Sequence, residues 1–133
     1  MVVNKSAVSK AAGAPFGDAA SLGDDEVDRI FRALADATRR DIVWRTLTEA
    51  QSVSALADEY DMSFAAVQKH VSVLEAAGLV NKNRQGRERL VRGNPETIRT
   101  VQSLLDRYES LWRQRIDRLD ALLADDPQDD NST

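Results

Sequence analysis

The chain has 133 residues, of which 42% are hydrophobic and 5% aromatic, so it can form one small domain but not a large core. It contains no cysteine, which excludes disulfides, thiolate metal sites and thiol redox sensing. No apolar run is long enough to span a membrane, and the N-terminus lacks the apolar segment of a signal peptide. We therefore expect a cytoplasmic location.

Residues 1–23 are rich in Ala, Gly, Ser and Asp and predict a flexible arm, with Phe16 as its one expected anchor. The first firm helix should begin after Asp24 or Asp25, because acidic residues suit the positive end of a helix dipole. Its apolar residues recur at helical spacing: Val27, Ile30, Phe31 and Leu34.

Asp36 is the predicted N-cap of the next helix, whose expected core residues are Ile42, Val43 and Leu47. Arg39 and Arg40 have two interpretations, contact with a phosphate or ion pairs that lock this helix to its neighbours. Trp44 lies beside the apolar stripe. We expect it to pack against another helix or a partner chain, with a ligand pocket as the alternative.

Residues 54–74 predict two short helices joined by a tight turn. Leu56, Ala57 and Tyr60 form the apolar face of the first helix, and Asp61-Met62 interrupts it with a residue type that tolerates a left-handed backbone. Ser63 then occupies an N-cap position, and the second helix buries Val67, Val71 and Leu74. This pattern predicts a helix-turn-helix, with an ordinary helical hairpin as the alternative.

A basic β-hairpin is predicted directly after the helix-turn-helix. Gly78 should end the second helix, Leu79-Val80 and Leu90-Val91 lie in the two strands, and Gln85-Gly86 is a turn dipeptide. Although the chain carries a net charge of −4, residues 63–92 contain six basic and two acidic residues, a net charge of +4. A basic face of this kind suits nucleic acid.

Asn94-Pro95-Glu96 predicts the start of a helix that continues to about Ala124. Its apolar stripe needs a second surface, and another copy of the same helix is the simplest one; a clamp over the chain's own domain is the alternative. We therefore expect an arm (1–23), a winged helix-turn-helix DNA-binding domain (24–94), a dimerisation helix (95–124) and an acidic disordered tail (125–133). The predicted fold class is mainly α with a small β-hairpin wing.

The stretches LADATRRDIVWRTL, VSALADEYDMSFAAVQKHVSVLEAAGLV and RQGRERLV resemble the ArsR family of winged-helix regulators over roughly residues 27–123. The segment ESLWRQRIDRLDALL further resembles a metal-independent subgroup of that family. The resemblance implies a homodimer formed by the first and last helices. The residues expected in the dimer interface are Val27, Ile30, Phe31, Leu34, Leu104, Leu105, Tyr108, Leu111, Trp112, Ile116 and Leu119.

DNA contacts are expected from the outward face of the second short helix and from the tip of the wing. Gln and Lys side chains can pair with adenine and guanine, and wing arginines suit the minor groove or phosphates. His70 is either a half-buried structural residue or a phosphate contact. The expected DNA-binding residues are Ser63, Phe64, Ala65, Gln68, Lys69, His70, Ser72, Arg84, Gln85, Gly86 and Arg87.

Metal sensing is not expected, despite the resemblance. The segment that bears cysteines in metal-sensing relatives carries Ser52 and Ser54, and the only histidine is His70. No catalytic constellation or cofactor motif is present, so we expect neither an enzyme nor a cofactor. The inducer would be a small apolar ligand at a helix junction near Trp44 and Trp112, or a protein, unless control is by concentration alone.

The pattern as a whole predicts a homodimeric, sequence-specific DNA-binding repressor or autorepressor that recognises an inverted-repeat operator. The alternative is a winged-helix module that binds protein or RNA without recognising a DNA sequence.

Overall fold

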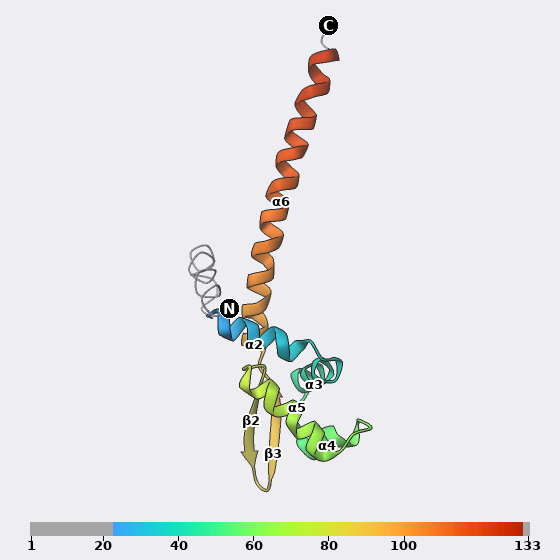
Figure 1. Cartoon of the computed structure of the whole chain (residues 1–133), viewed down its shortest axis with the longest axis vertical. Coiled ribbons are helices and arrows are strands. Elements are labelled where there is room, and N and C mark those ends of the chain that lie inside the picture. Colours follow the sequence, from blue (N-terminus) through green and yellow to red (C-terminus); the bar gives the residue numbers. More distant parts are fainter. Residues whose placement is uncertain (1–22, 132–133) are drawn as a thin grey trace, which may run out of the picture.

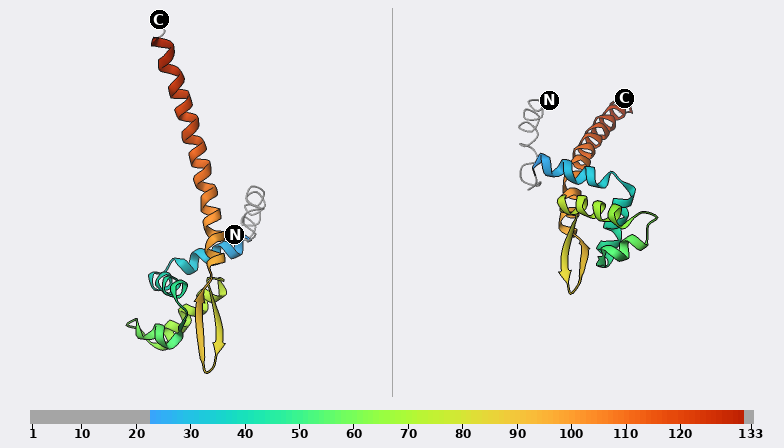
Figure 2. Two further views of the ribbon diagram at one scale, coloured as in Figure 1. Left: turned by 180° about the vertical axis from the view of Figure 1, so that it is seen from behind. Right: turned by 60° about the horizontal axis from the view of Figure 1, so that its bottom comes forward.

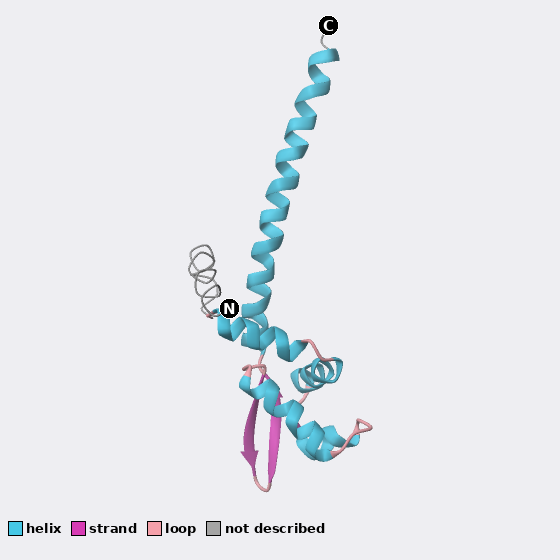
Figure 3. Ribbon diagram, viewed as in Figure 1, coloured by secondary structure: helices cyan, strands magenta, loops and turns pink. Residues whose placement is uncertain are grey.

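The computed structural model describes residues 23–131, with side chains described for residues 23–124. The predicted arm, apart from Gly23, and its anchor Phe16 lie outside the described residues. The elements follow in the order α2 (Asp24–Leu34), α3 (Ala37–Thr48), β1 (Gln51–Ser52), α4 (Val53–Asp58), α5 (Phe64–Ala76), β2 (Val80–Gln85), β3 (Glu88–Gly93) and α6 (Pro95–Asn131). Helices and a small antiparallel sheet form a winged helix-turn-helix, from which α6 projects as a long free helix (Figures 1 and 3).

The core lies between the short helices and the base of the hairpin. α2 contributes Ile30, α3 contributes Ile42, and the other fully buried large side chains are Leu56, Val67, Val71, Leu74, Leu79, Val80 and Val91. Thr46 is buried as well, and its hydroxyl donates to the carbonyl oxygen of Ile42 at 2.7 Å. The prediction that Leu47 is a core residue is wrong, because its side chain is 42% exposed at the edge of the domain.

Side-chain caps begin several helices where the sequence predicts them. The Asp36 carboxylate accepts from the backbone N–H of Arg39 at 3.0 Å, and the Ser63 hydroxyl accepts from that of Ala66 at 3.1 Å. These bonds satisfy backbone donors that have no partner within the helix. The expectation that Asp24 or Asp25 caps α2 is wrong: the N-cap is Gly23, whose N–H donates to Glu26 at 2.9 Å.

The turn between α4 and α5 needs no left-handed residue. Among the described residues, only glycines have a positive φ, so Asp61 does not adopt the left-handed backbone that the sequence suggested. Gly78 does adopt it, with φ of 76°, at the end of α5. There the N–H of Leu79 donates to the carbonyl of Leu74 at 3.0 Å, which confirms the predicted helix end.

The sheet has the strand order β1-β3-β2, with both pairings antiparallel. The turn of the wing is Gly86-Arg87, one residue later than predicted, and Gly86 has φ of 65°. A glycine with positive φ at the first central position is typical of a two-residue hairpin whose turn matches the strand twist. β1 was not predicted, because two residues carry no alternation and the strand exists only through its pairing with β3.

Helix α6 begins as predicted, with the Asn94 side chain accepting from the N–H of Glu96 at 3.1 Å. The Asn94 amide and the Thr97 hydroxyl both donate to the carbonyl of Gly78, which ties the start of α6 to the end of α5. The predicted end at Ala124 is wrong, because the helix continues to Asn131. Each further residue fixed in a helix adds a backbone hydrogen bond, which favours propagation beyond Ala124. The wing and the C-terminal end of α6 lie at opposite ends of the molecule (Figure 2).

Candidate nucleic-acid interface

The second helix of the helix-turn-helix, α5, has one buried and one exposed side. Val67, Val71 and Leu74 are fully buried, so they fix which side faces solvent. Every residue predicted for the outward face is exposed: Phe64, Ala65, Gln68, Lys69 and Ser72. Ser63, also exposed, has its hydroxyl oxygen committed to capping the helix. The exposed side therefore offers an amide (Gln68), an ammonium group (Lys69), a hydroxyl (Ser72) and an aromatic ring (Phe64) to a ligand.

The wing places arginines at its outer end. Arg84 lies directly opposite Arg89 in the β2–β3 register, and Gln85 lies opposite Glu88. Arg84, Gln85, Gly86 and Arg87 are all exposed. Like charges directly opposite each other in a sheet are unfavourable, so an Arg–Arg pair is suited to a site that an anion occupies. The fold thus brings the predicted wing residues together at one end of the molecule (Figure 1).

Arg89 is a candidate that sequence analysis counted in the charge but did not assign to the interface. Side chains alternate along a strand, so Arg84 and Arg89 share a sheet face with Val80 and Val91. That face contacts α5 at the base of the hairpin, where Val80 and Val91 are buried. Counting alternate residues outward from the buried Val91 would have identified Arg89.

Arg39 and Arg40, for which the sequence left phosphate contact and ion pairs open, form hydrogen bonds to backbone carbonyls of α2. Arg40 donates to the carbonyl of Leu34 at 2.7 Å, and Arg39 donates to those of Ala33 and Arg32 at 2.7 and 3.0 Å. Basic side chains at a helix C-terminus satisfy carbonyls that lack a partner. Both residues therefore lock α3 to α2. His70 is half-buried, and its Nδ1 lies 3.3 Å from a terminal guanidinium nitrogen of Arg39.

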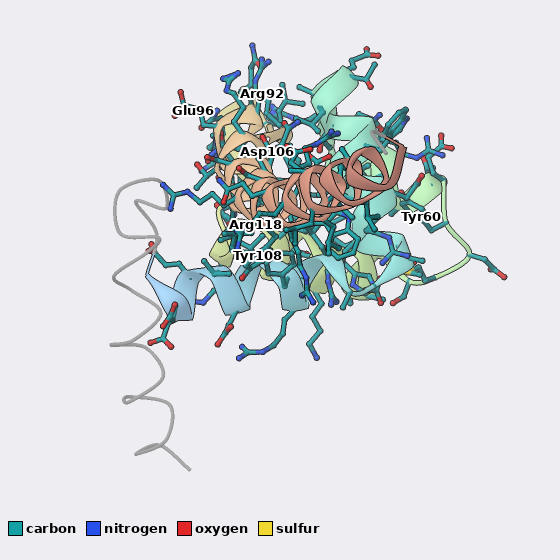
Figure 4. The ribbon with its side chains drawn as sticks, turned by 90° about the horizontal axis from the view of Figure 1, so that it is seen from above. Tyr60, Arg92, Glu96, Asp106, Tyr108 and Arg118 are labelled. Carbon is teal, nitrogen blue, oxygen red and sulfur yellow. The ribbon has the colours of Figure 1, made fainter. Side chains whose placement is uncertain are left out.

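The predicted dimer residues divide into three sets by their exposure in the single chain. Ile30 and Leu104 are only 2% and 8% exposed in the single chain, so they offer little surface to a partner. Val27 and Leu34 are half-buried. The remaining residues are exposed: Phe31, Leu105, Tyr108, Leu111, Trp112, Ile116 and Leu119. Tyr108 lies on the side of α6 towards α2, and Asp106 on the other side (Figure 4).

Trp44 is 74% exposed, so it is not packed against another helix in the part of the chain that the structure describes. Trp44 and Trp112 line separate surface hollows, the first beside Asp41 and Arg45 and the second beside Glu109 and Arg113. Among the described residues, the two tryptophans thus line different hollows and not one shared pocket.

Within residues 23–131, no three His, Cys, Asp or Glu side chains are grouped so that they could hold a metal ion. No helix in this part of the chain has the length and apolar character needed to cross a membrane.

The chain is similar to known DNA-binding regulators in both sequence and structure. A helix-turn-helix domain family matches residues 34–83. An uncharacterised HTH-type transcriptional regulator of Bacillus subtilis (strain 168), YuzN, is 40% identical over an alignment of 82 residues; the match covers 56% of this chain and 88% of that protein. The crystal structure of an ArsR family transcriptional regulator is 33% identical with a TM-score of 0.65, over 69% of this chain and 95% of that one.

The chain belongs to the ArsR family of winged helix-turn-helix transcriptional regulators. A further neighbour is the homodimeric winged helix-turn-helix DNA-binding domain of Mb0332 from Mycobacterium bovis, described as a possible ArsR-family regulator. It is 27% identical with a TM-score of 0.54, over 62% of this chain and 80% of that one. This ArsR-family chain is thus a DNA-binding transcriptional regulator and not an enzyme. Helix α5 occupies the position of the recognition helix, which is the second helix of a helix-turn-helix.

Proposed function

We propose that this regulator is a homodimeric repressor that binds an inverted-repeat operator and does not respond to metals. The observation that carries the proposal is the exposed polar side of α5 beside the arginines of the wing. Gln68 and Lys69 suit base edges in the major groove, and Arg84, Arg87 and Arg89 suit phosphates or the minor groove. Ser63, Phe64, Ala65, His70, Ser72, Gln85 and Gly86 complete the proposed DNA surface.

The proposed dimer rests on the exposed apolar side of α6. Leu105, Tyr108, Trp112, Ile116 and Leu119 follow one another at spacings of three and four, so they form one stripe along the helix. Each is between 36% and 59% exposed in the single chain. A stripe of large apolar side chains on a free helix is typical of an interface, and the neighbour Mb0332 is described as homodimeric. Phe31 of α2 would contribute to the same interface.

Repression follows from occupation of DNA by a small dimer that blocks access to a promoter. The segment around Ser52 and Ser54, which bears cysteines in metal-sensing relatives, has no thiol ligand here. The Ser52 hydroxyl instead caps α4. Release from DNA would then depend on a small apolar ligand, a protein partner or concentration. An effector must bind the free dimer better than the DNA-bound one, because equal affinity shifts nothing.

A gel-shift series tests the proposal. Genomic fragments selected by the purified protein should contain an inverted repeat with half-site centres about 34 Å apart, one turn of the duplex. The selected fragment should remain bound in the presence of excess competitor DNA, and a scrambled half-site should abolish the shift. Equal affinity for selected and scrambled fragments would contradict sequence-specific binding. A promoter fusion to the selected site should give lower expression when the protein is present.

A further inference from the structure

The guanidinium group of Arg39 joins three elements of the domain. Its Nε donates to the carbonyl oxygen of Ala33 at 2.7 Å, and a terminal nitrogen donates to that of Arg32 at 3.0 Å. Both carbonyls belong to the last turn of α2. The other terminal nitrogen lies 3.3 Å from Nδ1 of His70, in the middle of α5. One side chain of α3 thus connects the end of α2 with the recognition helix.

The contact determines which nitrogen of His70 carries the proton. A guanidinium has five N–H donors and no acceptor, and it stays charged at any ordinary pH. His70 Nδ1 must therefore be the acceptor, so the proton of the neutral imidazole is on Nε2. Asp36 is an acidic group near this pair, and the backbone hydrogen bond from Arg39, followed by the charge of that guanidinium, lowers the pKa of its carboxyl.

We propose that Arg39 is a positioning residue for DNA binding, which fixes the His70 imidazole as an Nε2–H donor for a phosphate oxygen at the flank of the recognition helix. The inference rests on the proposed function, because it assumes that α5 lies in the major groove. His70 is half-buried, whereas Val67 is buried and Lys69 is exposed, so His70 lies at the boundary between the buried and the exposed side of α5. A ring held from the Nδ1 side has its Nε2 on the opposite side.

The same contacts couple α5 to α2. Arg39 has a rigid planar fork, so a shift of the end of α2 displaces the group that holds His70. Phe31, which lies in the last turns of α2, is 40% exposed and available to a partner chain. Arg39 therefore gives the proposed dimer surface a direct connection to the recognition helix.

Arg40 provides a matched control. It also caps α2, through the carbonyl of Leu34, but His70 is not among its hydrogen-bond partners there. Arg39→Ala and Arg40→Ala both remove a cationic cap from the same helix end. Only Arg39→Ala removes the group that holds the imidazole.

A double-mutant cycle on operator affinity tests the proposal. We expect Arg39→Ala and His70→Ala each to weaken binding about tenfold, as for the loss of one charge-assisted hydrogen bond. Arg40→Ala should change affinity by less than about threefold, and the double variant should bind no more weakly than His70→Ala. Fully additive losses, or equal losses in Arg39→Ala and Arg40→Ala, would overturn the proposal. If Arg39→Ala does not fold, Arg39→Lys keeps the charge without the fork and should also lose affinity.

Nuclear magnetic resonance gives a readout that a loss of stability would not imitate. The chain contains one histidine, so a long-range ¹⁵N–¹H spectrum of the full-length protein at pH 8 shows a single imidazole. The wild type should show a protonated Nε2 and an unprotonated Nδ1, and the Nδ1 signal should move in Arg39→Ala but not in Arg40→Ala. A proton on Nδ1 of the wild type would overturn the inference. Failure of the wild type to bind any operator would instead contradict the proposed function itself.

Discussion

Asp41, Arg45 and Tyr60 form a polar cluster that joins α3 to the end of α4. The Tyr60 hydroxyl donates to Asp41 Oδ2, and Arg45 Nε lies 2.8 Å from the same oxygen. These two hydrogen bonds, from Tyr60 first and then Arg45, hold the pKa of the Asp41 carboxyl below its usual value of 3.8. Burial, and then the bond to Asp41, raise the pKa of Tyr60 to about 12. Figure 4 shows Tyr60 at the edge of the domain.

The cluster predicts how stability depends on pH. The contribution of ionised Asp41 is complete above the ordinary aspartate pKa of 3.8 and is lost as the pH falls through its lower folded value. The contribution of neutral Tyr60 is complete below pH 10.0 and is lost as the pH rises towards about 12. Tyr60→Phe should lower the free energy of unfolding by about 1 kcal/mol at pH 7, measured by urea denaturation. A deficit that stays the same size once the pH has fallen below the folded-state pKa of Asp41 would contradict this account.

Gly93 ends β3 where the strand passes α3. A Cβ built there would lie 2.6 Å from Leu47 Cγ and 2.9 Å from the Leu47 backbone nitrogen, and the backbone cannot move aside. Gly93→Ala should therefore destabilise the domain by about 1–3 kcal/mol, which thermal unfolding would detect. Gly86→Ala is the comparison: its Cβ would meet nothing within 4 Å, so only the strain of a positive φ remains. Equal stability of Gly93→Ala and the wild type would refute the close approach.

The arginines of the wing predict how the affinity for DNA depends on salt concentration. The logarithm of affinity falls with the logarithm of salt concentration in proportion to the number of phosphates neutralised. Arg84→Ala, Arg87→Ala or Arg89→Ala should each weaken binding on every sequence and reduce that slope by about one unit per protomer for each lost phosphate contact. Gln68→Ala should instead relax the preference at one base position with the slope unchanged. Wing variants with unchanged affinity and slope would remove the wing from the interface.

Helix α6 predicts an effect on assembly that spares the fold. Trp112 and Leu105 are 59% and 48% exposed, so replacing them with alanine should leave the stability of the single chain nearly unchanged. If a second copy buries both, each replacement should cost about 2–5 kcal/mol of dimer stability. Sedimentation across a concentration series should show dissociation of the Trp112→Ala, Leu105→Ala variant, with exposed Gln114→Ala as control. A wild type that is monomeric at micromolar concentration would contradict the dimer.

The side chains of the molecule as a whole predict that metal ions do not change its affinity for the operator. The sequence has no thiol, and residues 23–131 hold no group of three potential ligands. Zinc, cadmium, arsenite and peroxide at modest concentration should therefore leave operator affinity unchanged in a gel shift. A large loss of binding with stoichiometric zinc, reversed by a chelator, would require ligands elsewhere.

Features that depend on neighbouring residues were predictable from the sequence. Asp36, Ser63 and Asn94 cap helices because a short polar side chain reaches backbone N–H groups two or three residues away. Gly78 ends α5 because few other residues accept a positive φ. The buried side of α5 follows from helical spacing, and that spacing also determines which of its residues face outwards.

Features that depend on contacts between distant segments required the tertiary structure. Strand β1 exists only because β3 lies beside it, and the partners of Arg39 are set by how α2 and α5 pack against α3. Leu104 and Leu105 are adjacent apolar residues of one helix, yet the domain buries the first and leaves the second 48% exposed. Helical periodicity identifies an apolar stripe, but it does not say which surface covers each part of that stripe. The hydrophobic effect is non-directional, so any apolar surface can cover a residue, and only the packing of distant segments decides which one does.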